Sequence, residues 1–154
     1  MTSEQLTTAA ELLGLLIVAV TLIFLVTRIR QSIAYRSAIG LALGAALILV
    51  WINLAVGIIG DSDNPANLMY VGVLAIGFVG TLIVRFQPQG MGYVLFMMAL
   101  AHTLVVLIVL GAKLGVPAKP EPGVIVMLNG FFIAMWIGSG LLFRKAATTS
   151  SGRK

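Results

Sequence analysis

The sequence predicts an all-helical integral membrane protein, a single bundle of five transmembrane helices. Composition points there first, because 60% of the residues are hydrophobic, only 10% are charged, and the mean hydropathy is +1.09. A soluble domain carries about 25% charged residues, because its surface faces water. The arrangement agrees, since the apolar residues fall into runs of about 20, the length that a helix needs to cross a hydrocarbon core of about 30 Å.

Five such runs follow one another, each bounded by charges, prolines or glycines. They cover residues 8–27, 37–60, 67–84, 92–112 and 123–143, and residues 144–154 are predicted to form a flexible cytoplasmic tail. The runs are uniformly apolar rather than alternating, which favours helices over the strands of a membrane barrel. The connections are short, so consecutive helices are expected to be antiparallel neighbours. The first run is expected to remain, because the residues before it include Glu4 and no basic residue, unlike a signal peptide.

The distribution of charge predicts that the N-terminus lies outside and the C-terminus in the cytoplasm. Basic residues concentrate in the loops that face the cytoplasm. With the N-terminus outside, the outer loops hold only Lys113 and Lys119. The inner segments then hold the other eight basic residues, Arg28, Arg30, Arg36, Arg85, Arg144, Lys145, Arg153 and Lys154.

Several classes of function are disfavoured by what the chain lacks or by where its charges lie. The chain has no cysteine, which excludes disulfides, thiolate metal sites and thiol catalysis. The net charge of +5 lies at the ends of apolar runs rather than on one basic face, so nucleic-acid binding is not expected. No zinc-protease, phosphate-loop or nucleophile motif occurs, so the chain is not expected to be an enzyme, and no cofactor is predicted.

His102, the only histidine, lies near the middle of the run 92–112. An ionisable side chain at that depth is a functional hypothesis by default. A neutral imidazole there is a weak candidate to bind the metal of a haem or chlorin. The favoured interpretation is a neutral histidine that is hydrogen-bonded to a neighbour such as Asn53, Asn129 or a backbone carbonyl.

Two amides and one loop complete the polar candidates. Asn53 and Asn129 are expected to cross-link helices, and Asn53 shares a helix face with Gly57 and Asp61, which is compatible with a polar notch. In the outer loop, Asn64 before Pro65 predicts a helix start. The loop residues Asp61, Asp63, Asn64 and Asn67 resemble the opening of a calcium loop, but the glycine and the closing glutamate of such a loop are missing, so no metal site is predicted.

Small residues spaced three or four apart indicate where helices approach closely. The candidates for helix packing are Gly40 and Gly44, Gly77 and Gly80, and Ala134 and Gly138. The predicted role of each aromatic residue depends on its depth in the membrane. Tyr35, Tyr70 and Tyr93 lie at helix ends and are predicted to anchor at the membrane interface, whereas Trp51 and Trp136 are predicted to pack inside.

Three stretches resemble a family of small uncharacterised bacterial inner-membrane proteins. They are residues 51–70 (WINLAVGIIGDSDNPANLMY), 80–91 (GTLIVRFQPQGM) and 128–146 (LNGFFIAMWIGSGLLFRKA). Members of that family look like four-helix proteins, so the resemblance implies that the run 8–27 is an N-terminal extension. It also implies a multi-pass protein of the bacterial cytoplasmic membrane, and it supplies no activity, substrate or cofactor.

The expected function is that of a non-catalytic accessory or scaffold subunit. The minimal loops and the small-residue faces favour lateral packing in the lipid bilayer, against other membrane-protein subunits or against copies of the chain itself. The alternative is a small transporter or channel component with a polar face at Asn53 and Asp61. A third interpretation is a haem or chlorin binder through His102.

Overall fold

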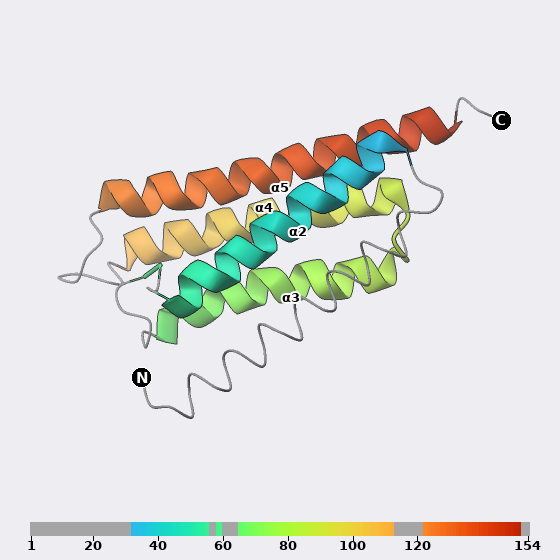
Figure 1. Cartoon of the computed structure of the whole chain (residues 1–154). Coiled ribbons are helices and arrows are strands. Elements are labelled where there is room, and N and C mark those ends of the chain that lie inside the picture. Colours follow the sequence, from blue (N-terminus) through green and yellow to red (C-terminus); the bar gives the residue numbers. More distant parts are fainter. Residues whose placement is uncertain (1–31, 56–57, 60–64, 113–121, 152–154) are drawn as a thin grey trace.

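The described part of the chain is all-helical and holds four helices that are long and apolar enough to cross a membrane (Figure 1). The computed structural model describes residues 32–55, 58–59, 65–112 and 122–151. Its elements are α2 (Ile33–Ala55), the short 3₁₀ helix η1 (Pro65–Asn67), α3 (Leu68–Ile83), α4 (Pro88–Gly111) and α5 (Pro122–Ser151). These helices indicate a membrane protein. The predicted helix over 8–27 lies outside the described residues.

The helices pack in the order α2, α5, α4, α3. α4 packs against α5 on one side and α3 on the other, and α2 crosses over α5 (Figure 1). Consecutive helices run in opposite directions, so the start of α2, the end of α3, the start of α4 and the end of α5 lie at one end of the bundle. This arrangement places the middle of α4 at the centre of the structure.

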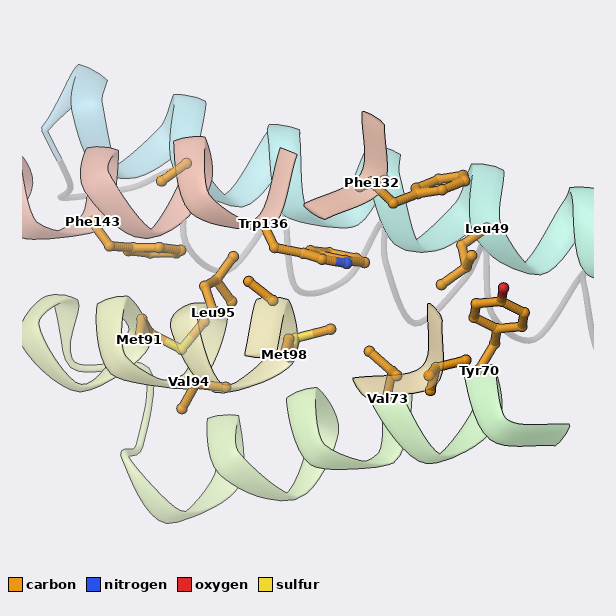
Figure 2. Packing of buried hydrophobic residues seen from close by; sticks show 14 of the residues in the cluster. Leu49, Tyr70, Val73, Met91, Val94, Leu95, Met98, Phe132, Trp136 and Phe143 are labelled. Atoms are coloured by element: carbon orange, nitrogen blue, oxygen red, sulfur yellow. The ribbon is translucent and has the colours of Figure 1, made fainter. Parts of the chain in front are cut away.

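The core between α4 and α5 is built from large apolar side chains. Trp136 and Phe143 of α5 lie beside Leu95 and Met98 of α4, while Phe132 lies farther along α5, near Leu49 of α2 (Figure 2), and all six are buried. The outer faces of all four helices carry exposed leucine, isoleucine, valine and phenylalanine side chains instead. An apolar exterior around an apolar core is what a lipid solvent allows, since lipid tails are as apolar as leucine.

α2 begins at Ile33, four residues before the predicted start. Ser32 explains the difference. Its Oγ accepts a hydrogen bond from the amide of Tyr35 at 3.3 Å, and its carbonyl accepts one from the amide of Arg36 at 3.1 Å. A serine in this position satisfies the otherwise unpaired amide hydrogens of a first turn, so the helix extends back into the predicted loop.

The connection from α3 to α4 is a tight turn over Val84–Gln87. Arg85 and Phe86 have positive φ angles of 50° and 59°, a left-handed backbone that costs about 1–2 kcal/mol for each non-glycine residue. The Tyr35 hydroxyl donates a hydrogen bond to the Phe86 carbonyl at 2.8 Å, which ties the turn to α2. Pro88 then starts α4 after Gln87, a position where its missing amide hydrogen is not needed.

The prediction of a flexible tail from residue 144 is wrong, because α5 continues to Ser151. Ala146 is buried against the core, which gives this last segment a packed face. The hydroxyls of Thr148 and Thr149 donate to the Lys145 carbonyl at 2.9 Å and 3.0 Å. The serine- and threonine-rich composition suggested disorder, but these side chains bond back onto the helix instead.

Candidate functional site

His102 and Asn129 meet in the middle of the bundle. The His102 Nε2 and the Asn129 Oδ1 lie 2.8 Å apart, and both side chains are fully buried. α4 supplies the histidine and α5 the asparagine, across the most extensive interface between the described helices. The structure thus brings together two of the polar residues that the sequence singled out.

Two aromatic residues complete this polar cluster, defined as Tyr70, His102, Asn129 and Trp136. The Tyr70 hydroxyl of α3 donates to the Asn129 Oδ1 at 2.8 Å, and the Trp136 Nε1 of α5 donates to the His102 Nδ1 at 3.3 Å. An indole N–H can only donate, so the Nδ1 is an acceptor and the proton of the neutral ring is on the Nε2. The His102 Nε2 therefore donates to the Asn129 Oδ1.

The remaining contacts hold the cluster rigidly. The Asn129 Nδ2 donates to the Ile125 carbonyl one turn earlier at 2.7 Å. The His102 ring lies 5.3 Å from the Tyr70 ring and stacks on Phe132 at 6.0 Å, measured between ring centroids. The cluster therefore ties α3, α4 and α5 together at one level, with its donors and acceptors paired inside the chain.

This arrangement does not fit a haem, a chlorin or another metal bound through His102. A ring nitrogen that binds a metal needs a free lone pair pointing at open space. Here the Nδ1 lone pair accepts from Trp136 and the Nε2 carries its proton toward Asn129. The part of the chain that the structure describes also holds no group of three residues capable of binding a metal ion.

Asn53 lies apart from the polar cluster, near the end of α2. Its side chain is half-buried, and its Oδ1 has no hydrogen-bond partner among the described residues. Gly57 and Asp61, which the sequence places on the same face, lie outside the described residues. The proposed polar notch at Asn53 and Asp61 thus rests on the sequence alone.

Of the four outer-loop candidates, only Asn67 is described, and its side chain has a structural role. Its Oδ1 accepts hydrogen bonds from the amides of Ile58 at 3.2 Å and Ile59 at 2.9 Å, and all three residues are buried. An oxygen engaged by two backbone donors closes the loop before α3 rather than facing a cation. Asp61, Asp63 and Asn64 lie outside the described residues.

Some of the predicted packing residues lie close to another described helix, and others do not. At Gly77 and Gly80 an added Cβ would meet Met98 or Val94 of α4 at less than 3.0 Å, so both glycines allow α3 to approach α4. Gly138 lies 3.5 Å from Leu41 of α2 by the same measure. The other predicted residues, Gly40, Gly44 and Ala134, make no such contact: a Cβ at either glycine would meet nothing within 4 Å, and Ala134 is exposed.

The aromatic predictions are wrong at three positions. Tyr35 and Tyr70 are buried rather than anchored at an interface, and Trp51 is 61% exposed rather than packed. Trp136 is buried, as predicted, and Tyr93 is exposed, so its place at the membrane interface stays a prediction. The error at Tyr70 matters most, because position near a helix end concealed a residue of the polar cluster.

Sequence reasoning also missed a close approach between the backbones of α4 and α5. At this crossing Gly92 and Gly140 face each other, and an added Cβ on either would lie 3.3 Å from the carbonyl oxygen of the other. Nearby, the Ser139 hydroxyl donates to the Ala38 carbonyl of α2 at 2.7 Å. The run of small residues from Gly138 to Gly140 was the available signal.

Comparison of the chain with protein-family models, with curated proteins and with solved structures finds no match.

Proposed function

We propose that this chain is a non-catalytic accessory or scaffold subunit, which docks sideways in the membrane onto a larger complex or onto copies of itself. The proposed location is the bacterial cytoplasmic membrane, with the N-terminus outside and the C-terminus in the cytoplasm. The observation that carries the proposal is a close-packing face on α2 that no described residue fills.

This α2 outer face consists of Ser37, Gly40, Gly44, Ile48 and Trp51. Their spacing of three or four residues places them on one side of the helix. Ser37, Gly40, Ile48 and Trp51 are exposed, and neither glycine has a neighbour near its Cβ position. Glycines four apart allow another helix to approach the backbone closely, and an adjoining tryptophan offers a large contact area.

The polar cluster supports a structural rather than a transport role. A pathway for ions or polar solutes is lined by groups that can exchange hydrogen bonds with the solute. His102 and Asn129, the proposed lining groups, are instead fully buried and bonded to each other and to Tyr70 and Trp136. Such a network stabilises the bundle without offering a vacant donor or acceptor.

The decisive experiment is purification of the tagged full-length chain from native membranes in mild detergent, followed by mass spectrometry and size measurement. We expect a stoichiometric partner or a homo-oligomer. The variant Gly40→Leu/Gly44→Leu should lose it, because two isobutyl groups prevent close backbone contact. Gly72→Leu is the matched control, since Gly72 of α3 is also exposed with nothing within 4 Å of its Cβ position. A lone monomer before substitution would contradict the proposal.

The predicted apolar helix over 8–27 is a second candidate occupant of the α2 outer face, and cross-linking separates the two. Because the chain has no cysteine, Gly44→Cys creates a single thiol. A disulfide dimer of the single-cysteine protein shows a second copy on this face. A disulfide formed only when a second cysteine is placed within 8–27, with the mass of one chain, assigns the face to that segment and contradicts the docking proposal.

A further inference from the structure

A cavity lies at the end of the bundle where α4 starts and α5 ends. It has a volume of about 340 Å³, and its lining residues are Gln89, Tyr93, Arg144, Ala147 and Thr148. All of these except Ala147 carry a charged or polar side chain. The cavity is far along the helices from the polar cluster and takes no part in it.

Arg144 is held in place by packing of its stem. An added Cβ at Gly92 would lie 3.1 Å from the Arg144 Cγ, so the stem of the arginine crosses α4 where that helix has no side chain. Gly140, one turn before Arg144, allows the two helices to approach at this level. The glycine pair therefore positions Arg144, an exposed residue, at the cavity.

The other donors at the cavity are uncommitted. Neither the Gln89 amide nor the Tyr93 hydroxyl has a hydrogen-bond partner among the described residues, whereas Thr148 already donates to Lys145. α4 starts at Pro88 without a side-chain cap, so the amide hydrogens of its first turn also remain as donors. The positive end of the helix dipole adds to the attraction for an anion.

The surrounding charge is of one sign. The basic residues of the described part, Arg36, Arg85, Arg144 and Lys145, all lie at this end of the bundle. The five acidic residues of the chain are Glu4, Glu11, Asp61, Asp63 and Glu121, none of which falls within the described ranges. No carboxylate of the described part therefore competes with an external anion for Arg144.

The apolar surface that adjoins the cavity, toward the middle of the bundle, indicates which kind of molecule bears the anionic group. On α4, Tyr93 is followed by Met97, Leu100 and Leu104 at intervals of three or four residues, and each is more than half exposed. On α5, Leu141 lies one turn before Arg144 and is also exposed. A ligand with an anionic group at the helix ends and long apolar chains directed along the helices would match both surfaces.

We infer that this cavity binds the phosphate group of an anionic phospholipid, with Arg144 as its cation and Tyr93 and Gln89 as further hydrogen-bond donors. A guanidinium group pairs with two phosphate oxygens, and basic pockets between transmembrane helices on the cytoplasmic side are suited to anionic headgroups. The acyl chains lie along Met97 and Leu100. This inference depends on membrane insertion and not on the scaffold role.

The test is native mass spectrometry of the full-length protein in detergent, titrated with phosphatidylglycerol or with phosphatidylcholine of the same acyl chains. We expect phosphatidylglycerol to bind about tenfold tighter or more, because the choline ammonium offsets the phosphate charge. Arg144→Gln should weaken the binding of phosphatidylglycerol about tenfold or more, the range for a hydrogen bond between charged groups. Glutamine keeps the Cγ that packs on Gly92, so the fold is preserved.

Lys145→Gln is the matched control, because it removes the same charge from the next residue, which does not line the cavity. We expect it to change the affinity by less than about threefold, the size of a surface charge effect. Equal losses in Arg144→Gln and Lys145→Gln, or no loss in either, would overturn the inference. Competition by inorganic phosphate at the concentration of half-saturating lipid would show that a free phosphate, rather than a lipid, occupies the site, and would overturn the lipid assignment.

Discussion

At the scale of single residues, the buried Asn129 side chain makes three hydrogen bonds. Its Oδ1 accepts from both Tyr70 and His102, and its Nδ2 donates to the Ile125 carbonyl. Removal of the amide would leave two buried donors without a partner, whereas removal of the Tyr70 hydroxyl would leave the Asn129 oxygen still bonded to His102. The two changes therefore have different costs, although they break the same network.

We expect Asn129→Leu to destabilise the protein by about 2 kcal/mol or more, because each orphaned buried donor costs about 1–3 kcal/mol. Tyr70→Phe should cost about 0.6 to 1.7 kcal/mol, the range for one hydrogen bond inside a membrane bundle. Unfolding in mixed detergent micelles, followed by circular dichroism, measures both. Equal costs would mean that Asn129 and Tyr70 contribute only as a pair and that the hydrogen bond from His102 to the Asn129 amide adds no stability.

At the scale of helices, the tolerance of a glycine to an added methyl group depends on how flexible the facing side chain is. A Cβ at Gly80 would lie 2.8 and 2.9 Å from the two Cγ atoms of Val94, while one at Gly77 would meet the sulfur and methyl end of Met98. Valine is β-branched and stiff at χ1, whereas methionine has three rotatable bonds. The α3–α4 contact is therefore rigid at one glycine and adaptable at the other.

We expect Gly80→Ala to cost about 1–3 kcal/mol through overpacking, and Gly77→Ala to cost less than about 1 kcal/mol. The double variant Gly80→Ala/Val94→Ala should recover part of the loss, because it removes the atoms that the new methyl group meets. The same micelle unfolding assay compares the three proteins. A larger loss of stability in Gly77→Ala than in Gly80→Ala would show that Met98, and not Val94, limits the approach of α3 to α4.

The existence of these helices could be predicted from the sequence, but the side of each helix that faces the core could not. Apolar runs 19 to 27 residues long give the four described spans without any knowledge of packing. Because the helices are apolar all round, periodicity does not show which side of α3 faces inward, and the position of Tyr70 near a helix end wrongly suggests an interface. For the same reason, the sequence indicated packing at Gly40 and Gly44 and not at Gly92 and Gly140, although only the second pair brings two described helices together.

At the scale of the whole molecule, the charge distribution gives the bundle two unlike ends. Arg36, Arg85, Arg144 and Lys145 occupy one end of the described part. The predicted bounds place all four residues in loops or in the tail, whereas in the structure Arg36 belongs to α2 and Arg144 and Lys145 belong to α5. Because α5 extends to Ser151, its last turns hold Arg144 and Lys145 at a defined position beside the start of α4 rather than on a flexible tail.

The positive end should face the cytoplasm, because Lys and Arg near helix ends are retained on that side. A fluorescent protein that matures only in the cytoplasm, fused after Lys154, should therefore fluoresce, and alkaline phosphatase fused at the same point should be inactive. The combined variant Arg36→Gln/Arg85→Gln/Arg144→Gln/Lys145→Gln should lower the fluorescent fraction, since it removes half of the eight basic residues assigned to the inside. Alkaline phosphatase activity in the unsubstituted fusion would place the C-terminus outside. The cavity at Arg144 would then lie in the outer leaflet, opposite to the one proposed.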